Sequence, residues 1–140
     1  MNFGIVGCGT IAEFYASAIK NIEGSRISDV FDVNPQSGEW FAKQQGATYH
    51  STYESLLRSQ VDAVCICTPS GLHADQVVKA SEAGKHVVVE KPIGITLEQL
   101  DKISEACKRT APNSVPFLSS IFRTACKKSN GAWTRDGWEN

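Results

Sequence analysis

Three small residues near the amino terminus, Gly7, Gly9 and Ala12, have the G-x-G-x-x-A spacing of a phosphate-binding turn. The apolar run 3–6 precedes them and predicts a buried strand, and residues 10–22 predict a helix. Gly7 permits a tight turn, Gly9 lets the backbone approach a diphosphate without a Cβ in the way, and Ala12 lets the helix pack closely. Free N–H groups at the start of the helix suit a diphosphate. The pattern therefore predicts a dinucleotide-binding turn.

An acidic residue follows at the distance that such a site needs. The predicted helix carries its apolar side chains on one face, at Ile11, Tyr15, Ala18, Ile19 and Ile22. The next apolar segment ends in Asp32, whose carboxylate at the tip of a second strand can accept hydrogen bonds from adenosine ribose hydroxyls. Two alternatives stay open, namely a glycine-rich turn that binds nothing and one that binds S-adenosylmethionine.

Length and composition indicate one ordinary globular domain with a core of its own. The chain has 140 residues, of which 41% are hydrophobic and 21% charged, and a net charge of −1. This balance gives no reason to expect nucleic acid or an anionic membrane as a partner. No apolar run reaches the length of a membrane span, and the first residues lack the charged start and cleavage site of a signal peptide. We expect a cytoplasmic protein.

The five cysteines give no metal or redox pattern, because none of them forms a C-x-x-C pair. Cys65 and Cys67 lie in an apolar run, where cysteine behaves as a small buried hydrophobe. Cys8 lies between two glycines, where its backbone matters more than its thiol. We expect all five to be reduced and non-catalytic, and we expect no metal site.

Beyond Asp32 the chain alternates between helical and strand patterns with short links. Parallel strands joined by right-handed helical crossovers give this order, so the predicted fold is α/β, a doubly wound parallel sheet in a single domain. Capping-box spacing is found at Ser51 with Glu54 and at Thr96 with Gln99. The predicted helices are 35–45, closed by Gly46, a short one after Ser51, 73–83, and one from Thr96 through Cys107; the predicted strands are 47–49, 63–67 and 87–89.

Three polar turns follow strands of the predicted sheet, at 7–11, 68–73 and 90–92. The carboxyl ends of parallel strands meet at one edge of a sheet, and ligands of such sheets bind there at the switch point. We therefore expect the three turns to lie together and to form the cofactor site.

Three motifs together resemble one family. VGCGTIA at 6–12, CTPSGLHAD at 67–75 and AGKHVVVEKPIGITLEQL at 83–100 are similar to the N-terminal NAD(P)-binding Rossmann domain of the Gfo/Idh/MocA oxidoreductases. The first motif is shared by many dinucleotide-binding proteins, whereas Glu90-Lys91-Pro92 after the strand is much more specific. The resemblance covers about residues 1–108.

The resemblance implies a role for each matching residue. The positions are Gly7, Cys8, Gly9, Thr10, Ile11 and Ala12 in the phosphate-binding turn, Asp32 at the adenosine ribose, Thr68, Pro69, Ser70 and His73 beside the nicotinamide, and Glu90, Lys91 and Pro92 in the motif whose lysine reaches the reacting hydroxyl or carbonyl. NAD is the cofactor that Asp32 favours, because the 2′-phosphate of NADP would meet a carboxylate; NADP is the alternative.

Lys91 is the candidate catalytic residue. An ammonium beside an alkoxide-like oxygen stabilises the charge that develops as hydride moves. Glu90 would help to keep Lys91 charged, and Pro92 stiffens the turn that aims it. The alternative for Lys91 is an exposed pair with Glu90 that contributes little. The alternative for His73 is a capping or packing residue at a helix start.

The last thirty residues change in character. Residues 111–140 show no clear helical or strand period, and we expect a poorly ordered, atypical tail with at most one edge strand at 115–122. Our hypothesis is that the terminus is out of frame or truncated. Sequencing of the gene tests it: an intact reading frame, with no family-like continuation in another frame, would refute the hypothesis. The alternative for the tail is a basic aromatic patch for single-stranded nucleic acid. We expect the domain organisation to be a dinucleotide-binding domain at 1–110, with the family's substrate domain absent.

The resemblance implies a function for the complete enzyme, namely hydride transfer between a nicotinamide cofactor and a hydroxyl of a sugar, polyol or nucleotide sugar. We expect this chain alone to be inactive, because the residues that would complete the site are missing. The runner-up is a non-catalytic nucleotide-binding fragment or subunit. Membership of the family also implies a homo-oligomer.

Overall fold

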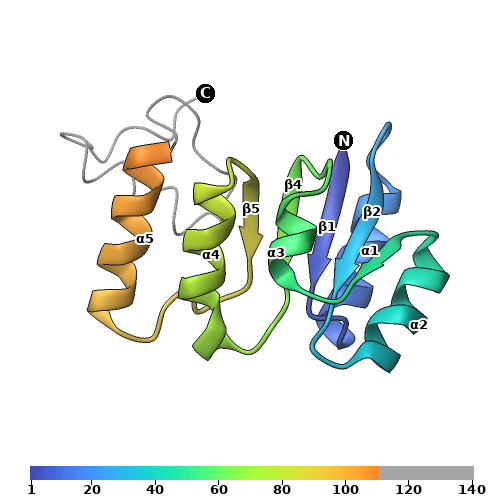
Figure 1. Ribbon diagram of the computed structural model, residues 1–140, viewed down its shortest axis with the longest axis horizontal. Helices are drawn as coiled ribbons and strands as arrows, with labels where there is room; N and C mark the ends of the chain where they lie inside the picture. Colours follow the sequence, from blue (N-terminus) through green and yellow to red (C-terminus); the bar gives the residue numbers. More distant parts are fainter. Residues whose placement is uncertain (111–140) are drawn as a thin grey trace.

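The computed structural model describes residues 1–110, which form one sheet with helices on both faces (Figure 1). The sequence-based predictions of a tail and an edge strand at 115–122 lie outside the described residues. In chain order the elements are β1 (Asn2–Val6), α1 (Thr10–Lys20), β2 (Arg26–Phe31), α2 (Pro35–Gln45), β3 (Thr48–His50), α3 (Tyr53–Leu57), β4 (Ala63–Ile66), a 3₁₀ turn η1 (Ser70–Leu72), α4 (His73–Glu82), β5 (His86–Val89) and α5 (Leu97–Thr110).

The sheet is parallel and has the strand order β3-β2-β1-β4-β5. β1 is the central strand, with Ile5 paired to Val30 of β2 and to Cys65 of β4. The chain moves outward from β1 through β2 to β3, and then crosses to β4 on the other side. A switch point therefore lies between β1 and β4, and the predicted doubly wound fold is confirmed.

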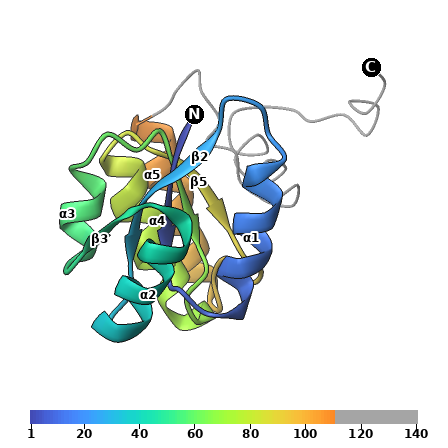
Figure 2. The ribbon, with the colours of Figure 1, turned by 90° about the vertical axis from the view of Figure 1, so that its right-hand side faces the viewer.

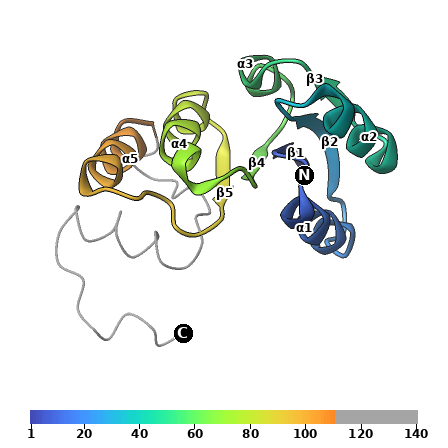
Figure 3. The ribbon, with the colours of Figure 1, turned by 90° about the horizontal axis from the view of Figure 1, so that it is seen from below.

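Two apolar cores flank the sheet because successive side chains of a strand point to opposite faces. On one face Phe3 and Ile5 pack with α1 and α2, and on the other Val6 packs with α3, α4 and α5. Figures 2 and 3 show α1 on one side of the strands and α4 and α5 on the other. Strands covered on both faces read as continuous apolar runs, which is why β4, with the sequence AVCI, is buried at every position.

The helix boundaries follow the capping signals, with small corrections. Gly46 closes α2 with a φ of 65°, as predicted. The N-cap of α3 is Thr52 and not Ser51, because the Ser55 amide donates to Thr52 Oγ1 over 3.2 Å. Thr96 accepts from the Gln99 amide at 3.2 Å, but the Gln99 side chain accepts from the Ile95 amide and so completes no strict capping box.

The buried face of α1 differs from the predicted one. The residues in the core are Ala12, Ala16 and Ile19, while Ile11 is 41% exposed. The prediction followed the helical spacing of mainly large apolar side chains. A helix that lies close to the sheet instead places small residues such as alanine at the contact. Tyr15, Ala18 and Ile22 instead line an apolar hollow between α1 and the neighbouring faces of β4 and β5. No helix among residues 1–110 is both long and apolar enough to cross a membrane.

Gly38 lets α2 approach β3 closely. A Cβ at this buried position would lie 2.4 Å from Cε2 of Tyr49, far inside van der Waals contact. The Tyr49 hydroxyl in turn donates to the Asp32 carbonyl at 3.4 Å. The contact between Gly38 and Tyr49 therefore helps to fix the turn that carries Asp32.

We predict that Gly38→Ala lowers the free energy of unfolding by about 1–3 kcal/mol, because the added methyl overpacks against the Tyr49 ring. Helix propensity alone predicts the opposite sign, because alanine favours a helix over glycine by about 1 kcal/mol. The substitution would therefore stabilise α2 if no side chain lay against Gly38. Glu39→Ala, at the next and exposed position, is the matched control and should change stability by less than about 0.5 kcal/mol. Urea unfolding of both variants measures this, and a stabilised Gly38→Ala would contradict the packing.

Candidate dinucleotide-binding site

Three turns meet at the carboxyl edge of the sheet, which is the lower edge in Figure 1. The turn after β1 contains Gly7, the turn after β4 contains Thr68, and the turn after β5 contains Lys91. Two contacts join the first pair of turns: a Cβ on Gly7 would lie 3.0 Å from the Thr68 amide nitrogen, and the Cys67 amide donates to the Val6 carbonyl at 2.8 Å. The three segments singled out in the sequence thus lie on adjacent strands.

Gly7 is fixed by the fold itself. Its φ is +88°, which lies in the left-handed region that favours glycine. A Cβ would also meet the Cys67 carbonyl carbon, the Thr68 amide nitrogen and the Thr68 methyl, each at 3.0 Å. The Gly7 amide donates to the Phe31 carbonyl at 2.9 Å, so the turn is tied to β2 as well as to β4.

Gly9 has a different character, because nothing in the protein lies within 4 Å of where its Cβ would be. Gly9 is the N-cap of α1 and has no side chain to cap the first N–H groups of the helix. The Ala12 amide bonds the Gly9 carbonyl at 3.0 Å, while an α-helix leaves its first N–H groups without intrahelical acceptors. An open space beside the uncapped amides of Thr10 and Ile11 is the chemistry that a diphosphate requires.

Asp32 ties the first turn to the turn after β2. One carboxylate oxygen accepts from the Cys8 amide at 2.7 Å, and the other accepts from the Asn34 amide at 2.8 Å. A carboxylate has about four acceptor positions, so two remain for hydroxyl donors. Asn34 also caps α2 through its side chain, which accepts from the Gln36 amide at 3.0 Å. The carboxylate thus stands at the tip of β2 with capacity to bind a ribose.

His73 joins the second and third turns. Its Nε2 lies 2.6 Å from the Thr68 carbonyl oxygen and its Nδ1 lies 2.7 Å from the Pro92 carbonyl oxygen. The side chain is 1% exposed, so both ring nitrogens are occupied inside the protein. A neutral imidazole can donate only one of these bonds at a time, whereas the imidazolium donates both. His73 therefore acts on the site by holding the two turns together.

The segment 68–70 lies between β4 and the start of α4. The Thr68 hydroxyl bonds the Gln76 side chain, and Pro69 precedes the 3₁₀ turn η1 that begins at Ser70. Pro69 is exposed, and Thr68 and Ser70 are half-buried. The segment therefore presents a polar, partly accessible rim to the same edge as Gly9.

The turn after β5 carries Lys91 in an exposed position next to a cis peptide bond before Pro92. Glu90 accepts a hydrogen bond from the Tyr15 hydroxyl at 2.7 Å. Among residues 1–110 the Lys91 ammonium forms no ion pair, so the alternative of a Lys–Glu surface pair is not the arrangement found. Lys91 is thus accessible at the edge where the other two turns end.

The thiols near the site are poor nucleophiles. Burial, together with the nearby Asp32 carboxylate, raises the pKa of Cys8 to about 12. Burial alone raises the pKa of Cys65 to about 12. Cys8, Cys65 and Cys67 form no disulfide, and a thiol that stays protonated at neutral pH is inert. Cys126 lies outside the described residues.

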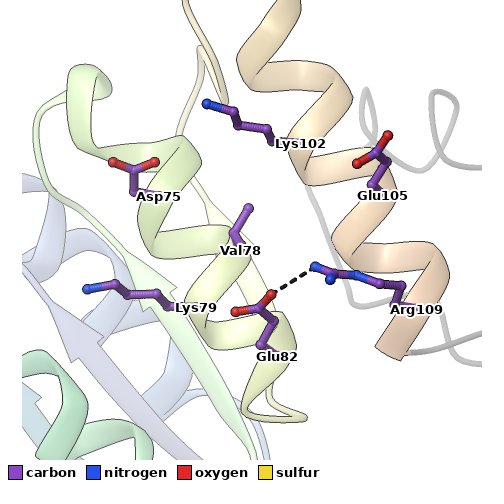
Figure 4. Close-up of a pocket in the computed structure, with 7 residues that line it drawn as sticks. All are labelled: Asp75, Val78, Lys79, Glu82, Lys102, Glu105 and Arg109. Atoms are coloured by element: carbon purple, nitrogen blue, oxygen red, sulfur yellow. Dashed lines mark hydrogen bonds and ion pairs between the residues drawn. The ribbon is translucent and has the colours of Figure 1, made fainter.

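A second hollow lies between the helices α4 and α5 (Figure 4). It is lined by charged side chains of both signs, and Arg109 pairs with Glu82 at 2.8 Å. These two side chains are 66% and 48% exposed, so the pair is a solvated one. No group of three potential metal ligands occurs within residues 1–110. The carboxyl edge is therefore the better candidate for a binding site.

A parallel sheet with this strand order, an uncapped glycine-led helix start and an acid at the tip of β2 defines the class of Rossmann dinucleotide-binding domains. Residues 1–113 match the Gfo/Idh/MocA oxidoreductases, a family with an NAD-binding Rossmann fold. The chain belongs to this family.

Relatives of known activity include sugar and polyol enzymes. The 2,7-anhydro-N-acetylneuraminate hydratase of Escherichia coli is 34% identical over all of this chain and 41% of its own length. The NAD⁺-dependent scyllo-inositol 2-dehydrogenase of Bacillus subtilis is 33% identical over 76% of this chain and 32% of its own length. The crystal structure of the WlbA dehydrogenase of Chromobacterium violaceum with NADH and UDP-GlcNAcA has a TM-score of 0.75 and 33% identity, over 79% of this chain and 32% of that one. The chain thus spans between a third and two fifths of the length of these relatives.

One contact at the site was missed by the sequence analysis. Tyr15 was assigned to the apolar face of α1, whereas its hydroxyl reaches Glu90 at the edge of the sheet. One indication of this contact was present in the sequence, the hydroxyl of Tyr15 on an otherwise apolar face of the predicted helix. A buried tyrosine hydroxyl usually has a hydrogen-bond partner, so one could have been expected.

We predict that His73→Ala lowers the free energy of unfolding by about 2–4 kcal/mol, because it removes the buried ring that lies between the Thr68 and Pro92 carbonyls and leaves a cavity. His86→Ala, on the exposed end of β5, is the matched control and should cost less than about 0.5 kcal/mol. Chemical denaturation followed by circular dichroism measures both. Equal, small effects would show that His73 does not hold the two turns.

Proposed function

We propose that this chain binds NAD at the carboxyl edge of the sheet. The uncapped amides at the start of α1 would hold the diphosphate, with Gly9 leaving room for it. Asp32 would accept hydrogen bonds from the adenosine ribose hydroxyls with its remaining acceptor positions. The observation that carries the proposal is the open, uncapped helix start directly beside the Asp32 carboxylate. NADP is the less favoured cofactor, because its 2′-phosphate would meet that negative charge.

Lys91 is proposed as the catalytic residue of the complete enzyme. Thr68, Pro69 and Ser70 on one side, and Glu90, Lys91 and Pro92 on the other, would flank the nicotinamide. When bound, the dinucleotide supplies the group that accepts or gives hydride. The Lys91 ammonium would hold the substrate oxygen and stabilise its negative charge as the carbon–hydrogen bond breaks. An ammonium that forms no ion pair with any side chain of residues 1–110 is suited to this task.

The substrate class proposed is a sugar, polyol or nucleotide sugar with an oxidisable hydroxyl. Support comes from the inositol dehydrogenase and the WlbA dehydrogenase to which the chain is similar. The chain is also similar to a hydratase. The net reaction depends on the whole protein, and the cofactor edge alone does not define it. A second candidate function is a nucleotide-binding unit without turnover.

We predict that the chain binds NAD more tightly than NADP and does not respond to S-adenosylmethionine in titration calorimetry. Asp32→Asn should weaken NAD binding by about tenfold or more and NADP binding by less, because the charged acceptor for the ribose is lost while repulsion of the 2′-phosphate is relieved. Asp101→Asn, an exposed change on α5, is the control and should alter neither affinity.

Two results would contradict the proposal. One is the absence of binding of either nicotinamide nucleotide by folded protein. The other is an equal loss of NAD and NADP affinity in Asp32→Asn, which would mean that the carboxylate only shapes the turn. Circular dichroism of the variant separates a loss of binding from a loss of the fold.

A further inference from the structure

The Lys91 turn is tied to α1, the helix that begins at the phosphate-binding turn. The Tyr15 hydroxyl donates to Glu90 Oε1 over 2.7 Å, between residues 75 positions apart in the chain. Burial raises the pKa of Tyr15, and the Glu90 carboxylate raises it further, so the hydroxyl stays protonated and able to donate. A hydrogen bond to an ionised acceptor is about twice as strong as one between neutral groups.

A second tie holds the other side of the same turn. His73 Nδ1 lies 2.7 Å from the Pro92 carbonyl oxygen, and His73 is itself buried in α4. Lys91 is thus placed between two anchored neighbours, while its own side chain is exposed and forms no ion pair in the described part of the chain. Anchors on both sides fix the backbone from which the lysine projects.

We propose that Tyr15 is a positioning residue for Lys91. Its hydroxyl fixes the turn after β5 against α1 and keeps the Glu90 carboxylate engaged, so that the Lys91 ammonium is free to meet a substrate oxygen. This role rests on the proposed function of Lys91. The bond itself also couples the helix whose first turn would hold the diphosphate to the segment that would hold the substrate, 75 residues further on.

Hydrogen exchange at the turn tests this assignment. In Tyr15→Phe we expect the Glu90 amide, which donates to the Ile66 carbonyl at 3.4 Å, to exchange about tenfold faster, the factor that corresponds to one charge-assisted hydrogen bond. Tyr53→Phe is the matched control, since it removes a hydroxyl bond of 2.8 Å, to the Gln76 carbonyl, from a more buried ring. It should leave exchange at the turn unchanged. Glu90→Gln keeps an acceptor for the hydroxyl and should retain most of the protection.

A spectroscopic signature separates positioning from mere packing. In protein labelled at tyrosine Cζ, which gives three signals, the Tyr15 signal should titrate above the ordinary range, and Glu90→Gln should lower its pKa by removing the nearby charge. Unchanged exchange at the turn in Tyr15→Phe, or a Tyr15 titration insensitive to Glu90→Gln, would overturn the assignment. Titration of the wild-type protein with NAD is the separate arm. If Tyr15→Phe accelerates exchange as expected but the wild-type protein binds no NAD, the proposed function is refuted, while the hydrogen bond between Tyr15 and Glu90 is supported.

Discussion

The Asp32 carboxylate is the interaction on which the cofactor edge depends. It accepts one amide from the turn after β1 and one from the turn after β2, and so sets the distance between the start of α1 and the tip of the second strand. A dinucleotide would need both of these points at once, for its diphosphate and for its adenosine ribose. The same group therefore organises the two turns and has acceptor positions left for a ligand.

The other half of the edge is held together by hydrogen bonds from two side chains. His73 links the turn after β4 to the turn after β5, and Tyr15 links the latter to α1. Their partners are backbone carbonyls and the Glu90 carboxylate, so each tie fixes a segment of chain and leaves the Lys91 side chain accessible. If Lys91 acts as proposed, preorganisation of this kind would reduce the free energy needed to order its ammonium around a substrate oxygen.

Much of the fold follows from local features of the sequence. Continuous apolar runs marked the strands because both faces of the sheet are covered, and Gly46 ended α2 because only glycine adopts its φ of 65° readily. The buried face of α1 was predicted only in part: Ile19 and the closely packed Ala12 are buried as expected, but periodicity gave Ile11 in place of Ala16. Local signals also misplaced the N-cap of α3 by one residue, because Ser51 and Thr52 are both good caps.

The candidate site was predictable as a set of turns but not as a network. Parallel topology brings the ends of β1, β4 and β5 to one edge, which follows from strand order alone. The ties between Tyr15 and Glu90 and between His73 and Pro92 join residues 75 and 19 positions apart, and no local pattern encodes such pairs. Their existence depends on the register of α1 and α4 against the sheet, which only the packed structure defines.

The central claim is that a diphosphate binds at the uncapped start of α1 while Asp32 holds the neighbouring sugar. The most direct measurement is a titration of ¹⁵N-labelled protein with NAD, followed residue by residue in amide NMR spectra. The account predicts the largest shifts at Gly9, Thr10 and Ile11, with smaller ones at Val33 and Asn34 beside Asp32. Shifts confined to the charged hollow between α4 and α5, or no shifts at all in folded protein, would contradict it.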